Sequence, residues 1–235
     1  SKKNYLDANY QYWQSGYLGK APNVESIIFR LQGTILKPKF DLPRKNHNVN
    51  LDFGCGHGAT VNYLNSKGYN SYGIDISKKD IKIAKNFFPH LKHKLKTCEK
   101  NIWEHDLTKF TNKKKIDLIT CQQSLYYFDK KEFENLLIAF SNAMSSKGIL
   151  YASMISNLHT YKKKSKKVKN SWLSEVNWEN NRIKVKKYFV HFIKNFSELK
   201  KKFKNFKIIL VGQYQHELDY SESNSHHYTI ICQKK

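Results

Sequence analysis

A short run of glycines carries the clearest chemical signal in the sequence. An apolar segment leads into the stretch Leu51-Asp52-Phe53-Gly54-Cys55-Gly56-His57-Gly58, and a helical segment follows. Glycine lets the backbone turn sharply and approach a ligand without a Cβ in the way. The first turn of the following helix adds N–H groups that lack a partner within the helix. Such a loop is typical of cofactor binding, both in dinucleotide enzymes and in other classes.

Two acidic residues narrow the class of ligand. Asp52 comes two positions before the first glycine, where its carboxylate would repel a pyrophosphate but suit a cationic or amine-bearing ligand. Asp75 ends the next predicted strand, where its carboxylate can accept hydrogen bonds from both hydroxyls of a ribose. Together they favour a cationic or amine-bearing ligand with a ribose over a dinucleotide.

The combination resembles the class I S-adenosylmethionine-dependent methyltransferases, whose motif is an acid, one residue and G-x-G-x-G, followed by an acid that ends the second strand. The resemblance runs from about Val24 to the C-terminus and is strongest over residues 50–128. It implies an α/β fold, a three-layer Rossmann-like arrangement of a seven-stranded sheet with helices on both faces. The sheet would be mostly parallel, with an antiparallel C-terminal hairpin strand. The cofactor would be S-adenosylmethionine, its product S-adenosylhomocysteine, and no metal is expected.

The resemblance also implies a cofactor site. Asp52 would face the amino group or the sulfonium, Asp75 would hold the ribose, and Ile76 would lie against the adenine ring. Asp106 would accept a hydrogen bond from the adenine amino group; the alternative is that it only caps the helix that follows it. The full set of implied cofactor residues is Asp52, Gly54, Cys55, Gly56, Gly58, Asp75, Ile76, Asp106, Leu107 and Gln122.

The residues that bind the methyl acceptor are less clearly marked. Direct in-line displacement needs alignment of the acceptor and exclusion of water, but no covalent intermediate. The candidates for catalysis are His159, which follows the fifth predicted strand, and Tyr126 and Tyr127, which follow the fourth. The family most often has His at the position of Tyr127, and the alternative for His159 is an ordinary surface histidine. The candidates for a substrate-covering lid are Trp13, Tyr17, Tyr126 and His159.

Motifs that are absent narrow the class of acceptor. The turn at residues 121–124 lacks the Asn/Asp-Pro-Pro-aromatic pattern of enzymes that methylate base amino groups, and no Pro-Cys motif for cytosine C5 chemistry exists. We therefore expect O- or N-methylation of a small molecule, an anionic metabolite or a sugar. The alternative is a methyltransferase that acts on RNA or another polyanion through a basic insert. Less favoured are a non-catalytic cofactor-binding scaffold and an NAD-type oxidoreductase.

The elements that would position these residues alternate between short β-rich runs and helical stretches, which predicts a βαβ sheet. One methyltransferase domain is expected at residues 24–235, after an aromatic N-terminal lid segment at residues 1–23. A lysine-rich insert at about residues 156–195 is expected to form a helical lid whose tryptophans pack on the sheet. Strands are predicted at 49–53, 71–76, 96–103, 116–121, 148–154, 206–211 and 228–233, and helices at 24–36, 59–66, 79–88, 131–144 and 197–203.

Composition sets the remaining limits. The chain has 235 residues and a formal net charge of +23, and more than half of that charge lies in residues 156–207. This segment could attract an anionic partner, or it could be a solvated lysine surface. The 4 cysteines include no C-x-x-C pair, which argues against a zinc site and a disulfide scaffold and indicates a reducing cytoplasm. No apolar run approaches the roughly 20 residues that span a bilayer, so we expect a cytoplasmic monomer or homodimer.

Overall fold

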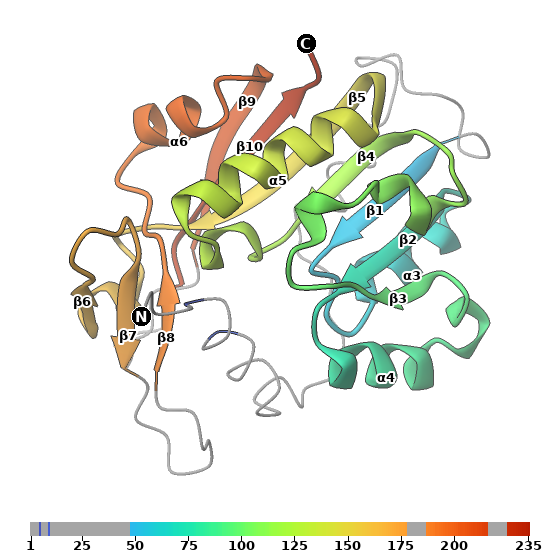
Figure 1. Cartoon of the computed structure of the whole chain (residues 1–235), viewed down its shortest axis with the longest axis horizontal. Coiled ribbons are helices and arrows are strands. Elements are labelled where there is room, and N and C mark those ends of the chain that lie inside the picture. Colours follow the sequence, from blue (N-terminus) through green and yellow to red (C-terminus); the bar gives the residue numbers. More distant parts are fainter. Residues whose placement is uncertain (1–4, 6–8, 10–47, 178–186, 216–224) are drawn as a thin grey trace.

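The computed structural model describes residues 5, 9, 48–177, 187–215 and 225–235 (Figure 1). Its main feature is a 7-stranded sheet in the order β3-β2-β1-β4-β5-β10-β9. Strands β1 to β5 pair in parallel, whereas β10 is antiparallel to both of its neighbours. The fold class expected from the sequence is therefore confirmed. The strands are β1 (Val49–Phe53), β2 (Asn70–Asp75), β3 (Leu95–Thr97), β4 (Ile116–Cys121), β5 (Met144–Ile155), β9 (Lys207–Tyr214) and β10 (His227–Gln233).

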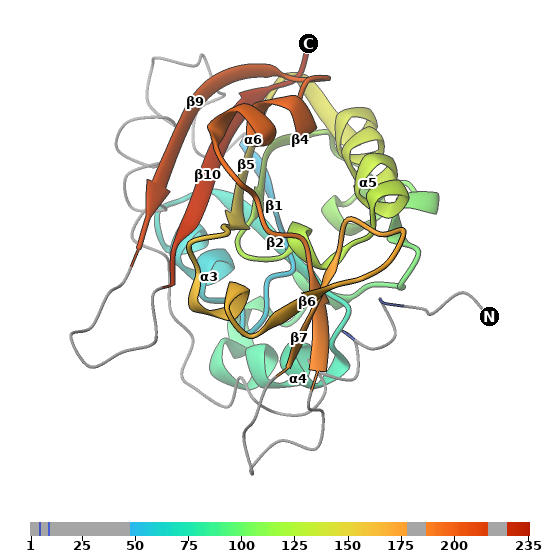
Figure 2. The same ribbon diagram turned by 90° about the vertical axis from the view of Figure 1, so that its left-hand side faces the viewer.

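Helices cover both faces of this sheet. Figure 2 shows α3 and α5 on opposite sides of it. Helix α5 begins with a capping box, in which Asp129 and Glu132 each accept the backbone N–H of the other. No helix in the described part of the chain is both long and apolar enough to cross a membrane. The helices are α3 (Ala59–Ser66), α4 (Lys78–Phe87), α5 (Lys130–Ala143) and α6 (Phe196–Lys202).

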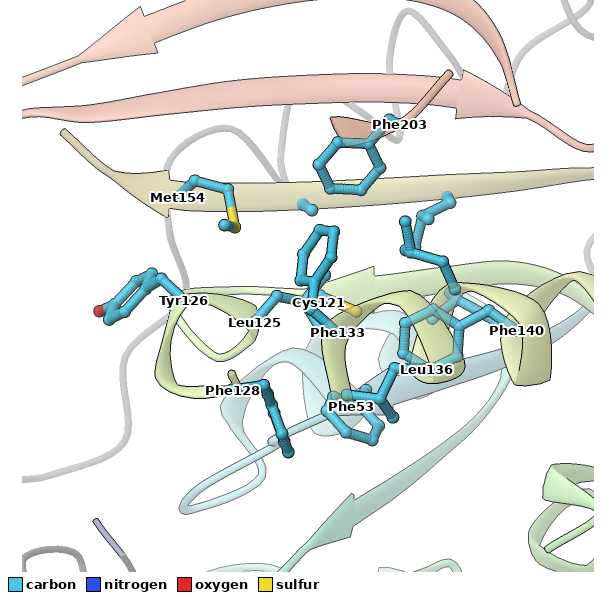
Figure 3. Close-up of a cluster of buried hydrophobic side chains, with 14 of the residues drawn as sticks. Phe53, Cys121, Leu125, Tyr126, Phe128, Phe133, Leu136, Phe140, Met154 and Phe203 are labelled. Carbon is cyan, nitrogen blue, oxygen red and sulfur yellow. The ribbon is translucent and has the colours of Figure 1, made fainter. Parts of the chain in front are cut away.

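The larger hydrophobic core lies between the sheet and α5. Phe53 of β1 meets Phe140 of α5 edge-on, with ring centroids 5.1 Å apart. Phe133 of α5 meets Phe203 in the same way at 5.6 Å, an arrangement that aromatic pairs favour. Figure 3 shows Phe140 at one end of this cluster and Tyr126 at the other. The core therefore reaches the loop after β4 and holds that loop in place.

The third strand differs from the prediction. β3 ends at Thr97, and two 3₁₀ helices follow at Ile102–Glu104 and Leu107–Thr111. Its partner β2 ends at Asp75, directly opposite Thr97, so β2 offers no further backbone groups to extend the ladder. The predicted third strand exists, but its predicted end at residue 103 was wrong, because the length of a strand depends on its partner. The loop at the carboxyl edge of β3 therefore begins at Cys98.

The lysine-rich insert also differs from the prediction. It forms a small antiparallel sheet of β6 (Ser165–Lys167), β7 (Ser174–Asn177) and β8 (Lys187–Val190). Val176 pairs with Tyr188, and both side chains are buried. β-Branched and aromatic residues of this kind favour strands over helices. The expected helical lid was therefore wrong for the described part of the insert.

Trp172 contacts the loop after β4 and helix α5, whereas the sequence analysis expected it to pack on the sheet. Its Nε1–H donates to the backbone oxygen of Phe128 at 2.9 Å, and its ring meets that of Phe133 edge-on at 5.3 Å. The backbone N–H of His191, just after β8, donates to the backbone oxygen of Tyr126 at 2.8 Å. Figures 1 and 2 show the small sheet beyond one end of the large sheet. The insert is thus joined to the loop after β4. Trp178 and the helix predicted at residues 24–36 lie outside the described residues.

Candidate functional site

The glycine loop connects β1 to α3 at the carboxyl edge of the sheet. Gly54, Gly56 and Gly58 have φ angles of +72°, +50° and +80°, in the left-handed region that side chains disfavour. A Cβ at Gly54 would lie 2.6 Å from the Cβ of Ser124, whereas a Cβ at Gly56 would have no neighbour within 4 Å. Cys55 between them is buried, and burial raises the pKa of its thiol. The loop thus packs tightly at Gly54 and borders open space at Gly56.

Asp75 directs its carboxylate at this loop from the end of β2. Its Oδ2 accepts the N–H of Gly56 and its Oδ1 accepts the N–H of Ser77, each at 2.8 Å. Burial raises the pKa of this carboxyl to about 6, although the two N–H donors act in the opposite direction. An ionised carboxylate has about four acceptor positions, so Asp75 can accept two further hydrogen bonds. Ile76 beside it is half-buried and packs against the main core.

One short polar contact joins β1 to β4, and another joins the loop after β4 to the start of α3. Asp52 is 3% exposed, and its Oδ1 accepts the hydroxyl of Thr120 at 2.5 Å. The Nε2 of Gln122 donates to the hydroxyl of Thr60, also at 2.5 Å. These contacts place Asp52 and Gln122 on the same edge of the sheet as Asp75, as the sequence indicated.

Asp106 caps a helix in this structure. Its carboxylate accepts both the backbone N–H of Thr108 at 2.9 Å and the Thr108 hydroxyl at 2.7 Å. These two bonds lower the pKa of Asp106. Leu107, the first residue of the capped 3₁₀ helix, is buried in the main core. The capping alternative therefore accounts for the bonds that Asp106 makes, and its contact with adenine stays a prediction.

Glu99 is a candidate that the sequence analysis missed. It lies two residues after β3, and the N–H of the preceding Cys98 donates to the backbone oxygen of Asp75 at 2.9 Å. Its carboxylate forms an ion pair with Lys109 at 3.2 Å. Because β3 ends at Thr97 and not at Trp103, Glu99 stands as close to the carboxyl end of β3 as an adenine-binding residue would, and it joins Asp106 as a candidate. The end of the β-rich run at Thr97 is the signal that would have identified Glu99.

His57 ties the glycine loop to α4. Its Nε2 lies 3.2 Å from the Oδ1 of Asp80, and the side chains of both residues are buried. The N–H of Asp80 donates in turn to the hydroxyl of Ser77, which caps α4. The loop is therefore held on two sides, by Asp75 at Gly56 and by Asp80 at His57.

The three candidates for catalysis follow β4 and β5, so they and Asp75 lie on opposite sides of β1 and its glycine loop. Tyr126 and Tyr127 belong to a 3₁₀ helix after β4, and their ring centroids are 4.6 Å apart. His159, after β5, accepts the N–H of Tyr161 at Nδ1 over 3.1 Å. Burial lowers the pKa of His159 to about 3, so the ring is neutral and carries its proton on Nε2. This geometry makes His159 a hydrogen-bond donor at Nε2 and argues against a catalytic role as a general base.

The N-terminal segment is described at two residues. Asn9 is fully buried; its Oδ1 accepts the N–H of Phe189 at 2.7 Å, and its Nδ2 donates to the backbone oxygens of Phe189 and Tyr127 at 2.8 and 3.0 Å. The ring of Tyr5 lies 4.8 Å from that of Phe189. Asn9 is thus anchored to β8 and to the loop after β4. The lid candidates Trp13 and Tyr17 lie outside the described residues.

Replacing Asn9 by alanine is expected to lower the thermal unfolding midpoint. The change leaves the Phe189 N–H and two backbone oxygens without this partner, and an unpaired buried polar group costs about 1–3 kcal/mol. For a chain of this size the midpoint should fall by roughly 3–8 °C in a circular dichroism melt. Asn86→Ala, at an exposed position of α4, is the matched control and should leave the midpoint unchanged. Equal melting of the two variants would show that Asn9 is no anchor.

A comparison with known families identifies the chain. A family model described as a methyltransferase domain matches residues 32–202, which is well over half of the sequence. The chain belongs to this methyltransferase family. The methyltransferase is a class I enzyme, and its cofactor is S-adenosylmethionine, as the sequence motifs implied.

Individual relatives agree with this family. The 2-heptyl-1-hydroxyquinolin-4(1H)-one methyltransferase of Mycobacteroides abscessus is 32% identical over 80 residues, which are 32% of this chain and 34% of that protein. The match thus spans about a third of the relative's length. A SAM-dependent methyltransferase from Anabaena variabilis has a TM-score of 0.70 at 17% identity, with 99% and 96% of the two chains covered. The Burkholderia thailandensis 1,6-didemethyltoxoflavin-N1-methyltransferase has a TM-score of 0.63 at 13% identity, with 100% and 91% covered. Both structures show that the fold is shared.

The glycine loop fits S-adenosylmethionine on its own geometry. Gly56 leaves open space where a side chain would stand, and the Asp75 carboxylate beside it has acceptor positions to spare for a ribose. In the described part of the chain, no group of three or more His, Cys, Asp or Glu side chains is arranged to hold a metal ion.

S-Adenosylhomocysteine should bind more weakly as the pH falls through about 6. Ribose hydroxyls donate to the ionised Asp75, whose pKa is raised to about 6 by burial, so affinity should fall about tenfold per pH unit below that value. Because the folded-state pKa is raised, the folded chain gains stability as the pH falls through about 6, so a loss of affinity there would not come from unfolding caused by Asp75. Calorimetry between pH 5 and 8 checks this. The Asp75→Asn variant should bind weakly with little pH dependence, and a flat profile in the wild type would contradict the assignment.

Proposed function

We propose that the methyltransferase binds its cofactor along the carboxyl edge of β1, β2 and β4. Asp75 accepts the ribose hydroxyls, Ile76 lies against adenine, and Asp52 faces the amino-acid end. The observation that carries this proposal is the hydrogen bond from Gly56 to Asp75, because it makes the ribose acceptor and the open glycine loop one unit. Glu99 or Asp106 binds the adenine amino group. The remaining members of the site are Gly54, Cys55, Gly58, Leu107 and Gln122.

The reaction that we propose is direct transfer of the methyl group to an oxygen or nitrogen of a small molecule: the lone pair of that atom would displace the thioether of S-adenosylhomocysteine, and the proton of the acceptor would pass to water. The bound cofactor supplies an electrophilic methyl group on a sulfonium. The chain's own residues align the acceptor and exclude water, which lowers the entropic part of the barrier. The loop after β4 is suited to this task because Ser124 packs directly on Gly54, while Tyr126 and Tyr127 follow it.

Two relatives support a small-molecule acceptor. Their names give a hydroxyquinolinone and a didemethyltoxoflavin as the compounds that they methylate. An anionic metabolite or a sugar is also a small molecule, so either acceptor falls within the same proposal.

The proposal keeps the domain limits expected from the sequence, which are an N-terminal lid at residues 1–23 and an insert at about residues 156–195. We also propose a cytoplasmic location for the enzyme, since its 4 cysteines are free thiols. For the assembly we propose a monomer or a homodimer.

One observation favours the second candidate, a polyanionic substrate such as RNA. Four lysines surround a hollow between α4 and the loops beside β3, and an anionic backbone could follow such a surface. They are Lys78, Lys82, Lys85 and Lys92. This hollow lies on α4, whereas the tyrosines and His159 follow β4 and β5, so we rank this function below small-molecule methylation.

Transfer of a labelled methyl group separates the candidates. Labelled S-adenosylmethionine is incubated with 2-heptyl-1-hydroxyquinolin-4(1H)-one, 1,6-didemethyltoxoflavin or oligouridylate at 50 and 300 mM NaCl. We expect label on a small molecule, at rates that change little with salt. Label on oligouridylate that falls steeply with salt would favour the polyanion instead. No transfer to any of these three acceptors, with cofactor binding intact, would count against the proposed function and favour a non-catalytic scaffold. The Asp75→Ala variant serves as the negative control.

A further inference from the structure

Six aromatic side chains form a closed circuit on the acceptor side of the glycine loop. Starting from Tyr126, the ring centroids of successive members lie 4.6, 6.4, 5.9, 4.3, 5.4 and 6.1 Å apart, and the last contact returns to Tyr126. These distances lie in the range of direct aromatic contact. The members of this aromatic circuit, in order, are Tyr126, Tyr127, Tyr188, Tyr161, His159 and His227.

The circuit draws on four separate parts of the fold. Tyr126 and Tyr127 follow β4, His159 and Tyr161 follow β5, and Tyr188 lies on β8 of the insert. The sixth member, His227, is the first residue of β10. Because β10 runs antiparallel to β5, His227 lies beside the last residue of β5, and His159 follows shortly after that strand. Residues far apart in sequence therefore converge at the edge of the sheet that carries the glycine loop.

A short path connects the aromatic circuit to the proposed methyl donor site. Ser124 packs against Gly54 and donates its hydroxyl to the backbone oxygen of Phe53 at 3.0 Å. Tyr126 comes two residues later and is itself buried. The aromatic circuit is thus the next layer of side chains beyond the loop that would hold the methionine end.

The chemistry of the circuit is aromatic and polar, without lysine, arginine or carboxylate among its members. The two histidines present different groups. His159 accepts an amide at Nδ1 and so carries its proton on Nε2. His227 faces the backbone oxygen of Ser225 with Nδ1 at 2.8 Å, and because a carbonyl oxygen only accepts, Nδ1 carries a proton.

We propose that the aromatic circuit is the acceptor subsite and that it takes a flat aromatic compound bearing a hydrogen-bond-accepting oxygen or nitrogen. The ring system would stack on the tyrosines, of which Tyr127 and Tyr161 are half-buried, and the Nε2–H of His159 would donate to the heteroatom. This inference rests on the proposed function and narrows it, because an anionic metabolite would need cationic partners that the circuit lacks. His159 is a positioning group for the acceptor.

Saturation-transfer NMR on the enzyme saturated with S-adenosylhomocysteine tests this inference. The probes are quinolin-4-ol, ribose 5-phosphate and oligouridylate. We expect quinolin-4-ol to bind, with an affinity that changes less than twofold between 50 and 300 mM NaCl. His159→Ala and Tyr161→Ala should each weaken it at least tenfold, His159→Gln should restore part of the loss because an amide can also donate, and His90→Ala, an exposed histidine, should change nothing.

Calorimetry of S-adenosylhomocysteine on the same samples separates the failures. If the cofactor product binds but quinolin-4-ol does not, or if the His159 and Tyr161 variants bind the probe as wild type does, this inference is overturned and the cofactor assignment stands. Preferential binding of ribose 5-phosphate or oligouridylate would also overturn it. Loss of cofactor-product binding in the wild type would overturn the proposed function itself. The ¹⁵N shifts of His159 give a measurement that needs no variant: a proton on Nδ1 would contradict the proposal.

Discussion

Replacing Asp75 by alanine is expected to weaken S-adenosylhomocysteine binding by about 1.5–3 kcal/mol, or roughly 10- to 150-fold. The change removes the acceptor of the ribose hydroxyls, and it also releases the Gly56 N–H that Asp75 holds at 2.8 Å. Both effects act on the bound cofactor, so the binding loss should exceed any loss of stability. Isothermal titration calorimetry at pH 7.5 measures it.

The matched control for this variant is Asp129→Ala. Asp129 is also a carboxylate that accepts a backbone N–H, but this N–H belongs to the first turn of α5 and not to the glycine loop. Its loss should lower stability by about 1 kcal/mol and leave the affinity for S-adenosylhomocysteine unchanged. If Asp75→Ala binds as tightly as Asp129→Ala, the ribose is held elsewhere.

Replacing Gly56 by alanine is expected to reduce methyl transfer by about 100-fold or more, from two independent effects. Alanine at φ +50° is strained by about 1–2 kcal/mol. Its methyl group also enters the open space that the cofactor would fill, which should lower affinity by a further tenfold or more. Turnover with labelled cofactor measures the combined loss, calorimetry of the cofactor product measures the loss of affinity, and a thermal melt measures the strain.

Gly68→Ala isolates the backbone strain. Gly68 has a φ of +85° in the turn after α3, remote from the carboxyl edge of the sheet. This variant should lose a similar amount of stability but keep its affinity for the cofactor product. Equal affinities for Gly56→Ala and Gly68→Ala would mean that the open space at Gly56 is not the cofactor site.

Much of the sheet could be predicted from local sequence, because the first and fourth strands are apolar runs with clear limits. β1 ends where Gly54 begins the loop, and β4 ends at Cys121, both as predicted. The same holds for Asp75, which stands at the end of its strand and faces the loop. These features could be predicted because the residues that end each strand also form the loop or the carboxylate of the candidate site.

The errors arose where partners decide the structure. The length of β3 is set by β2, which ends at Asp75, so the predicted strand ran too far and covered Glu99. The insert reads as a lysine-rich stretch, yet its strands are organised by buried contacts of Val176, Tyr188 and Phe189. The protonation of His159 depends on a single N–H from a local turn. None of these follows from residue type or spacing alone.

A crystal structure of the enzyme soaked with S-adenosylhomocysteine tests the central claim most directly. The account predicts one molecule on the carboxyl edge of the sheet, with both ribose hydroxyls within hydrogen-bonding distance of the Asp75 carboxylate. The homocysteine part should pass over Gly56 toward Asp52 and end beside the aromatic circuit. A ligand whose ribose is held by another carboxylate, or one bound away from the glycine loop, would contradict it.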